Sequence, residues 1–524
     1  MQAFVEFTAG MIWSPALIAL CLGAGLFYSV ITRFVQIRLF REMLLLLVKG
    51  KSSRTGISSF QALAVSLSGR VGTGNIAGVA AAIGFGGPGA VFWMWIVAFL
   101  GAATAYAEST LAQIYKETDE GQYRGGPAYY FEKALGAKWY SWIFAIATII
   151  ATGVLMPGVQ SNGIGNAVVL VAGEGSLISL PVFGDVGSTK LVTASIICGL
   201  LAFIVLGGVK RIAKFTEVVV PVMAMTYLIT AFVVIALNID ELPRIVGMIV
   251  GDAFSPMAGV GAAIGWGVKR GIYSNEAGQG TGPHAAAAAE VQHPAQQGLV
   301  QAFSIYIDTL VVCTATAFMI LITGAYNVHG LGDAYIVQNE LANGLLANSP
   351  QFTQMAIESI FPGVGKPSVA IALFFFSFTT LLAYYYIAET NVAYIHKSIR
   401  VPGLTAALKV GILLATFYGT IKTANLAWGL GDIAVGAMAW LNIIGVMTIF
   451  FVAKPAIKAL RDYERQRREG VENYTFDPLK LGIANAEFWE GKIEASESRL
   501  QDSEGLELKG SQKTELEIRI ETST

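Results

Sequence analysis

The sequence predicts an all-α integral membrane protein with about 11 transmembrane helices. Of its 524 residues, 54% are hydrophobic and only 14% are charged, whereas an average soluble domain has about 25% charged residues. Long uncharged runs recur along the chain, and their lengths match the roughly 20 residues that a helix needs to cross a bilayer core. Composition and spacing therefore both favour a multi-pass membrane protein.

Uncharged runs define most of the predicted spans. They cover residues 11–32, 71–107, 141–173, 191–209, 218–239, 309–332, 367–388 and 433–453. The sequence Gly86-Gly87-Pro88-Gly89 is a turn signal that divides the second run into two helices. Weaker spans at 55–85, 253–290 and 402–421 carry isolated charges and complete the expected eleven.

The positions of the basic residues predict the orientation. Lysine and arginine gather after the first and the last span: Arg33, Arg38, Arg41, Lys49, Lys51 and Arg54, then Lys454, Lys458, Arg461, Arg465, Arg467 and Arg468. By the positive-inside rule both segments are cytoplasmic. Because eleven is odd, we expect the N-terminus outside the cell membrane and the C-terminus inside. The polar tail 493–524 is expected to be disordered.

Two segments inside the predicted spans are rich in glycine and polar residues. One is GRVGTGNIAG at 69–78, and the other is GWGVKRGIYSNEAGQGTG at 265–282. Each glycine costs a helix about 1 kcal/mol relative to alanine. Irregular backbone in a bilayer is tolerated only where protein buries it or where it lines a cavity. Glycines can also serve close helix packing, but two clusters with intramembrane charges favour two broken helices.

The order of the broken helices predicts an inverted repeat. With the first helix set aside, they are the first and the sixth of ten, so each repeat has five spans and the second copy is inverted. Secondary transporters show this pattern, with a binding site near the middle of the membrane. The expected parts are 1–54 (extra helix and basic linker), 55–240 (first repeat), 241–455 (second repeat) and 456–524 (cytoplasmic segment).

The two glycine-rich motifs carry a family resemblance. SLSGRVGTGNIAGVA at 66–80 and GVKRGIYSNEAGQGTGPHAAAAAE at 267–290 closely resemble the alanine or glycine:cation symporter family, sodium-coupled carriers related to the amino acid-polyamine-organocation superfamily. VGTGN at 71–75 is similar to the unwound first core helix of sodium-coupled leucine and neurotransmitter transporters. The resemblance implies the leucine-transporter fold, a five-plus-five inverted repeat, here with one extra N-terminal helix.

The first broken helix and its neighbours supply the predicted substrate site. Freed backbone amides of Thr73 and Gly74 would bind a carboxylate, and Asn75 offers both an oxygen and an NH2 group. Gln160, in an interruption at 156–163, would donate to the substrate, or would instead bridge two helices. Trp266 would form an aromatic wall, although helix packing is the commoner use of an indole. The complete set is Thr73, Gly74, Asn75, Gln160, Trp266 and Gly267.

A sodium site is predicted opposite the same break. Sodium needs several oxygens, and the unwound helix offers the carbonyls of Ser68 and Val71. Resemblance to the leucine-transporter fold implies that the Phe376 carbonyl and the hydroxyls of Thr379 and Thr380 complete the site. The alternative is that each threonine hydroxyl binds the carbonyl four residues earlier.

Arg70 has two possible roles. It could meet the substrate carboxylate, but a structural pair with Glu108, Glu276 or Asp308 is favoured, because buried charges are normally paired.

Sodium-driven symport of a small neutral amino acid into the cell is the favoured function. Proton coupling or exchange through Glu108, Glu276 or Asp308 is the alternative. An enzyme is disfavoured, because none of the four histidines has metal-ligand spacing to another. The expected ligands are the amino acid, Na+ and lipid, with no nucleic acid; the sequence indicates no oligomeric state.

Overall fold

The computed structural model describes residues 2–49, 53, 55–181, 183–206, 209–255, 259–330 and 334–495, and it is helical over most of them. Lys51, Arg54 and most of the predicted tail therefore lie outside the described residues. Within the described chain, eight helices are long and apolar enough to cross a membrane. The number is nine if α1 (Gln2–Ile12) and α2 (Pro15–Ile31), which meet at a bend of 42°, form one span.

The uninterrupted spans follow the predicted runs closely. They are α7 (Gly89–Ile114), α9 to α10 (Lys138–Ala172, with a π-turn at Ala151–Leu155), α11 (Ser188–Val205), α12 (Val209–Leu237), α16 to α17 (Pro294–Thr323, with a π-helix at Tyr306–Cys313), α19 (Gly365–Ser398), α20 (Leu404–Ile421) and α21 (Ala424–Val452). The predicted interruption at 156–163 is wrong, because α10 (Pro157–Ala172) is continuous there and the irregular turn precedes Pro157. Proline is tolerated at a first helical position, where its missing N–H is not needed.

Two further helices are broken within the predicted glycine-rich segments. Helix α5 (Ser59–Arg70) ends before Val71 and Gly72, after which a π-helix (Gly74–Gly78) leads into α6 (Val79–Gly86). Helix α14 (Val260–Asn275) is followed by six non-helical residues and then by α15 (Gly282–Ala288). Gly278 and Gly280 have φ values of 78° and 86° there, a region that glycine enters without steric cost.

Short elements connect the spans. The helices are α3 (Val35–Arg38), α4 (Phe40–Lys49), α8 (Pro127–Leu135), α13 (Leu242–Phe254), α18 (Gln351–Ile360) and α22 (Pro455–Arg468), with 3-10 turns at Ile239–Glu241 and Glu340–Ala342. Three antiparallel hairpins pair β1 (Glu117–Asp119) with β2 (Gln122–Arg124), β3 (Leu177–Leu180) with β4 (Gly184–Gly187), and β5 (Val328–His329) with β6 (Tyr335–Val337).

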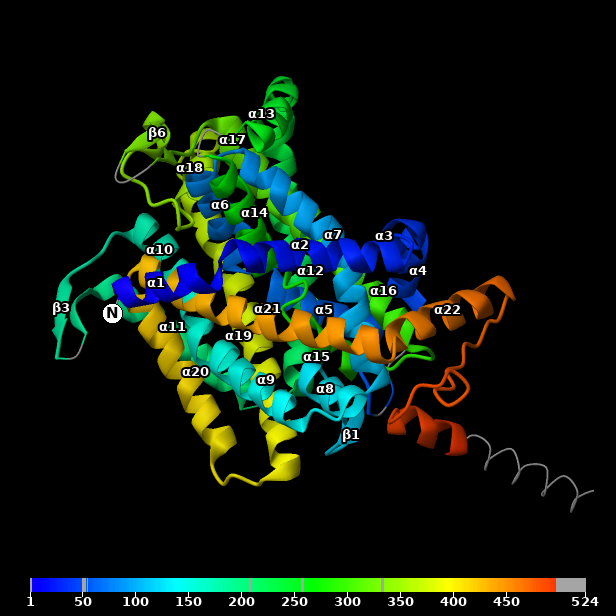
Figure 1. Ribbon diagram of the computed structural model, residues 1–524. Coiled ribbons are helices and arrows are strands. Elements are labelled where there is room, and N and C mark those ends of the chain that lie inside the picture. The colour runs from blue at the N-terminus through cyan, green and yellow to red at the C-terminus, as the bar shows by residue number, and fades with distance from the viewer. Residues whose placement is uncertain are drawn as a thin grey trace, which may run out of the picture.

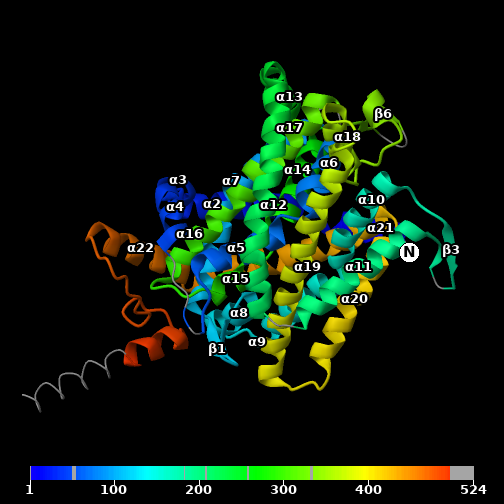
Figure 2. The same ribbon diagram turned by 180° about the vertical axis from the view of Figure 1, so that it is seen from behind.

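Burial separates central helices from peripheral ones. The apolar windows of α19 and α7 are 72% and 67% buried, whereas those of α11, α12 and α20 are each 33% buried. The peripheral helices turn apolar side chains outward, among them Phe203, Phe232 and Leu414. Such an apolar exterior suits lipid rather than water. Figures 1 and 2 show α12, α19 and α20 on the face opposite α2.

The connecting loops gather at two ends of the molecule. At one end Lys397 pairs with Glu117 at 2.5 Å, and Ile57 bridges to Ala289. In Figure 1, α8, β1 and α22 lie toward this end, and β3 and β6 lie away from it. At the other end Asn348 donates to Asn425. Loops that were predicted to be cytoplasmic are therefore collected together.

Candidate functional site

Three helices converge on the break in the first interrupted helix. Val71 leaves the helical conformation (φ −77°, ψ 87°), and the Gly72 amide donates to the Asn75 side chain at 2.8 Å. A Cβ atom on Gly72 would lie 2.5 Å from Thr380 Oγ1 in α19 and 2.8 Å from Gln160 Oε1 in α10. Only glycine fits between these two side chains, which explains why this residue marks the break.

The predicted substrate ligands Thr73 and Gln160 bind one another in this structure. The Thr73 amide donates to Gln160 Oε1 at 2.9 Å, and Gln160 Nε2 donates to the Tyr384 hydroxyl at 3.3 Å. The Thr73 hydroxyl lies 2.7 Å from the hydroxyl of Ser377. Gln160 thus bridges α10, the break and α19, so the amide expected to receive a carboxylate has a protein acceptor here. Sequence reasoning missed Ser377 and Tyr384, which complete this cluster.

The threonine pair of α19 lies beside the same break. The hydroxyls of Thr379 and Thr380 donate to the Phe376 carbonyl at 3.0 and 2.9 Å, and Thr379 also donates to the Phe375 carbonyl at 3.0 Å. These are the bonds to the preceding turn that the alternative interpretation expects. A hydroxyl that donates its proton keeps two lone pairs. The Thr380 oxygen next to Gly72 therefore remains chemically suited to a cation.

The remaining predicted sodium ligands lie on the last turn of α5. Ser68 is fully buried, and its hydroxyl donates to the Val65 carbonyl at 2.7 Å. Val71 is the C-cap residue of α5, and its amide donates to the Leu67 carbonyl at 2.7 Å. The carbonyls at such a helix end lack the following turn of amides as partners. The Ser68 and Val71 carbonyls are therefore at the end of the helix that runs into Gly72, the residue beside the Thr380 hydroxyl.

The second broken helix meets the first near Gly74. A Cβ atom there would lie 3.2 Å from Ser274 Cα and 3.3 Å from the Tyr273 ring. The Tyr273 ring packs on Trp428 of α21 with centroids 4.9 Å apart. Tyr273 and Ser274 are neither charged residues nor glycines, so no sequence signal singled them out as site residues. Their place beside Gly74 can be predicted only when the start of the second break is known exactly.

Trp266 and Gly267 lie elsewhere, which corrects the predicted extent of the second break. Helix α14 continues to Asn275, so both residues are more than two turns before the non-helical residues. A Cβ atom on Gly267 would lie 2.5 Å from the Ala90 carbonyl oxygen of α7. The Trp266 ring stacks on Phe85 at 4.7 Å. In this structure both residues make contacts between helices, and close packing is a common use of glycine in membrane helices.

The favoured direct ion pair of Arg70 is also corrected. Arg70 is 1% exposed, and its Nη1 donates to Gln301 Oε1 at 3.1 Å and to the Ser304 hydroxyl. Its Nε and Nη2 atoms have no hydrogen-bond partner within the described part of the chain. The amide and hydroxyl of α16 hold the guanidinium, while the acids act on it through space.

Asp308 is the acid that approaches the break most closely through hydrogen bonds. It is fully buried and accepts from Asn75 Nδ2 at 2.6 Å, from Thr309 Oγ1 at 2.7 Å and from Ser274 Oγ at 3.1 Å. Asn75 and Asp308 stand on two facing π-helices, Gly74–Gly78 and Tyr306–Cys313. Such irregular turns occur frequently at functional sites. Both ends of the Asn75 amide are therefore engaged by protein groups.

An ion cluster joins α14 to α21 on the far side of Tyr273. Arg270 donates to both carboxylate oxygens of Asp432, at 2.8 and 3.2 Å, and Lys269 lies 2.5 Å from the same group. The Arg270 guanidinium also lies 4.1 Å from the centre of the Trp428 ring. Lys269 and Arg270, two of the intramembrane charges noted in the sequence, are therefore paired with an acid in the folded chain.

Comparisons with known proteins agree on the family. Residues 1–478 match the sodium:alanine symporter family. The chain is 55% identical to YrbD of Bacillus subtilis strain 168, a proposed sodium/proton-dependent alanine carrier, over 94% of this chain and 98% of that one. It is 49% identical to the sodium/proton-dependent alanine carrier of Bacillus sp. strain PS3, over 86% and 97%.

A solved structure shares the fold. The crystal structure of MhsT in complex with L-phenylalanine aligns with a TM-score of 0.53 and 14% identity, covering 78% of this chain and 99% of MhsT. At this identity the likeness establishes the fold alone. The mostly helical membrane architecture predicted from the sequence is confirmed to that extent.

Proposed function

This chain belongs to the sodium:alanine symporter family, and we propose that it carries alanine, glycine and similar small neutral amino acids into the cell together with sodium. The family and the relatives are transporters, so the chain is a carrier and not an enzyme. The names of both relatives support alanine as cargo and a cation as the coupling ion. We infer that this ion is sodium rather than a proton.

The observation that carries this proposal is the convergence at Gly72. A backbone amide, two hydroxyls and the end of α5 meet there in a fully buried place between α10 and α19. Free amides at a helix break attract an anion, and helix-end carbonyls attract a cation. One break can therefore bind the carboxylate of an amino acid on one side and sodium on the other.

The hydrogen bond between Thr73 and Gln160 suggests how the substrate enters. A substrate carboxylate would take the Thr73 and Gly74 amides, and Gln160 would turn from the amide toward the substrate. Sodium would be bound by Ser68, Val71, Phe376, Thr379 and Thr380. Mutual binding of Thr73 and Gln160 keeps the buried amide satisfied when no substrate is present.

We also propose that the chain has eleven spans in a five-plus-five inverted repeat with one extra N-terminal helix. This number is supported by the candidate spans of the described chain, up to nine, taken together with the interrupted pairs α5–α6 and α14–α15. We place the repeats at 55–240 and 241–455, the N-terminus outside and the C-terminus in the cytoplasm.

Proton coupling is the second candidate, and the buried acids favour testing it. Asp308, Glu276 and Glu108 are each at most 1% exposed, and Glu276 Oε1 has no hydrogen-bond partner within the described chain. Carboxylates at such depth are candidate proton carriers. The relatives' names include both ions.

Uptake into proteoliposomes separates the two ions. We expect labelled alanine to accumulate in the vesicles when sodium is present outside at constant pH. This accumulation should stop when choline replaces sodium. Accumulation driven by a pH step without sodium would favour proton coupling instead.

In the same assay unlabelled alanine and glycine should compete, whereas alaninamide should not, because it lacks the carboxylate that the amides of Thr73 and Gly74 bind. Competition by alaninamide at the affinity of alanine would contradict the proposed pose.

A further inference from the structure

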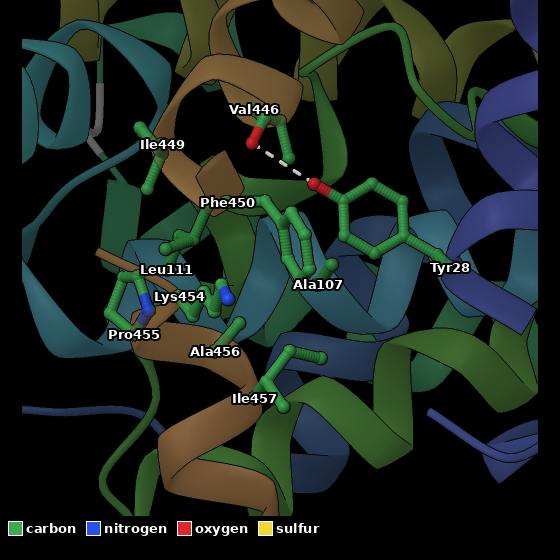
Figure 3. Close-up of a pocket in the computed structure, with 10 residues that line it drawn as sticks. All are labelled: Tyr28, Ala107, Leu111, Val446, Ile449, Phe450, Lys454, Pro455, Ala456 and Ile457. Carbon is green, nitrogen blue, oxygen red and sulfur yellow. Dashed lines mark hydrogen bonds between the residues drawn. The ribbon is translucent and has the colours of Figure 1, made fainter. Parts of the chain in front are cut away.

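The chain after the last span lies across one end of the molecule. Lys454, with φ of 54°, and Pro455 turn the backbone sharply from α21 into α22. Figure 3 shows this turn against Tyr28 and Phe450, around a small cavity. Residues 469–495 continue toward α8 and β1 (Figures 1 and 2). We call residues 455–495 the C-terminal strap.

Beneath the strap, the two broken helices are joined at their ends. Ile57 lies just before α5, and Ala289 directly follows α15. The Ile57 amide donates to the Ala288 carbonyl at 3.0 Å, and the Glu290 amide donates to the Ile57 carbonyl at 2.8 Å. This bridge ties the first interrupted helix to the second.

The strap covers the bridge with a buried aromatic anchor. Trp489 is 2% exposed, and its indole N–H donates to the Gln113 carbonyl at the end of α7 at 2.8 Å. Lys116, fully buried beside it, donates to the Ala289 carbonyl at 2.9 Å and lies 4.5 Å from the Phe488 ring centre. The bridge residue Ala289 is thus held by a lysine that the strap encloses.

Two further contacts bind the strap to the same loop. Lys492 pairs with Glu290 at 3.3 Å, and Asp462 lies 3.3 Å from Nε2 of the buried His293. Burial lowers the pKa of Lys116 well below its usual value. A buried lysine is unfavourable unless its surroundings compensate for the lost water. Aromatic faces and a carbonyl supply that compensation here.

We propose that the C-terminal strap is a latch on the bridge between Ile57 and Ala289, and that it must loosen before α5 and α15 can part. The inference rests on the proposed function, since alternating access requires one end of the broken helices to open around a fixed site. Because Phe488 and Trp489 of the strap lie over the Lys116 ammonium together with Tyr123 of β2, release of Trp489 would open one side of this lysine to water. The Lys116 ammonium could then bind water in place of the Ala289 carbonyl.

Amide hydrogen exchange of the full-length protein tests the latch. The readouts are the peptides that contain the Ile57 and Glu290 amides, because exchange there reports opening of the bridge. Lys492→Glu places a repelling charge next to Glu290 on a half-exposed residue. We expect it to accelerate exchange in both peptides roughly two- to fivefold, the range that an exposed ion pair supports. Trp489→Ala should accelerate exchange by about tenfold or more, since it removes a buried anchor.

The matched control is Lys480→Glu. Lys480 is in the strap and 86% exposed, and its ion pair is with Asp477 of the same segment, so exchange at the bridge should not change. Unchanged exchange in both peptides for folded Lys492→Glu and Trp489→Ala proteins would overturn the latch. Acceleration by Lys480→Glu equal to that of Lys492→Glu would overturn it too. The exchange measurement is made without added amino acid and compares variants in one buffer, so an error in the proposed cargo leaves this result readable.

Discussion

The threonine pair of α19 shows how one side chain can satisfy the fold and still serve a ligand. Both hydroxyls complete hydrogen bonds to the preceding turn, so neither is an unsatisfied buried group. Only Thr380 also lies against Gly72, at the break of the neighbouring helix. Hydrogen bonding therefore leaves both threonines as candidate sodium ligands, and position relative to the break favours Thr380 of the two.

Sodium dependence follows from this arrangement. The double substitution Thr379→Val with Thr380→Ala removes two candidate sodium oxygens. We expect the sodium concentration for half-maximal alanine uptake to rise at least about tenfold, equivalent to about 1.4 kcal/mol. Thr390→Ala is the matched control, because Thr390 is buried in the same helix and donates to the Tyr386 carbonyl at 2.9 Å. An unchanged sodium dependence in the folded double variant would place the ion elsewhere, with Asn75 the next candidate.

Single residues were harder to predict than the break that surrounds them. Thr73, Gly74 and Gln160 were predicted as site residues because glycines and amides are conspicuous in apolar sequence. Tyr384 and Ser377 lie in a long uncharged helix, where a hydroxyl has no pattern that separates it from packing residues. Arg70 was expected to pair with an acid, but Gln301 and Ser304 take that place. Contacts between helices that are far apart in the sequence determine these partners. Residue spacing along the chain contains no information about such contacts.

At the scale of elements, glycine has two opposed uses in this chain. Near 72 and 276–281 the backbone leaves the helix, whereas Gly267 allows α14 to approach α7 closely. Both uses give the same local sequence signal, because each needs a missing Cβ atom. The existence of two broken helices was therefore predictable, but the limits of the second break were not. Trp266, the predicted aromatic wall, is therefore in the continuous part of α14 and not in the break.

The N-terminus of α16 makes the strap sensitive to acid. His293 Nδ1 accepts from the Ala295 amide at 3.1 Å, so Nε2 carries the proton that faces Asp462. Burial lowers the pKa of His293 below its usual value of about 6.5. As pH falls, His293 takes up a second ring proton in the unfolded chain before it does so in the folded chain. The contribution of neutral His293 to the free energy of unfolding is therefore present above about pH 6.5 and is lost below it.

Thermal unfolding in detergent checks this pH dependence. Between pH 7.5 and 5.5 we expect the melting temperature of the unsubstituted protein to fall by about 2 °C or more beyond the fall in His293→Asn. Asparagine keeps an acceptor for the Ala295 amide, so the helix cap survives while the titrating group is removed. His396→Asn, which removes a histidine of α19 at the same end of the molecule and leaves the contact between His293 and Asp462 in place, should keep the full pH dependence. Equal falls in the unsubstituted protein and in His293→Asn would contradict the assignment.

At the scale of the whole molecule, charge and contact divide the loops in the same way. Segments expected in the cytoplasm touch one another, as in the ion pair between Arg38 and Glu464 at 2.6 Å. Segments expected outside also meet, since the Lys422 ammonium donates to the Phe183 carbonyl at 3.4 Å. If the chain crossed the bilayer one time more or fewer between two contacting loops, these loops would lie on opposite sides of the membrane and could not touch. The agreement supports the parity of the eleven proposed spans.

Cysteine labelling with a membrane-impermeant reagent tests both parity and direction. Gln2 and Asp185 are exposed and separated by four proposed crossings, and the strongly exposed Lys480 follows seven more. We expect Gln2→Cys and Asp185→Cys to label in intact cells, and Lys480→Cys to label only in inverted vesicles. The unsubstituted protein is the control, because Cys21 and Cys313 are buried and Cys198 is inside α11. Labelling of Asp185→Cys and Lys480→Cys from one side would refute an odd number of crossings between them. Reversed labelling of all three would keep the fold and invert it in the membrane, contrary to the positive-inside rule.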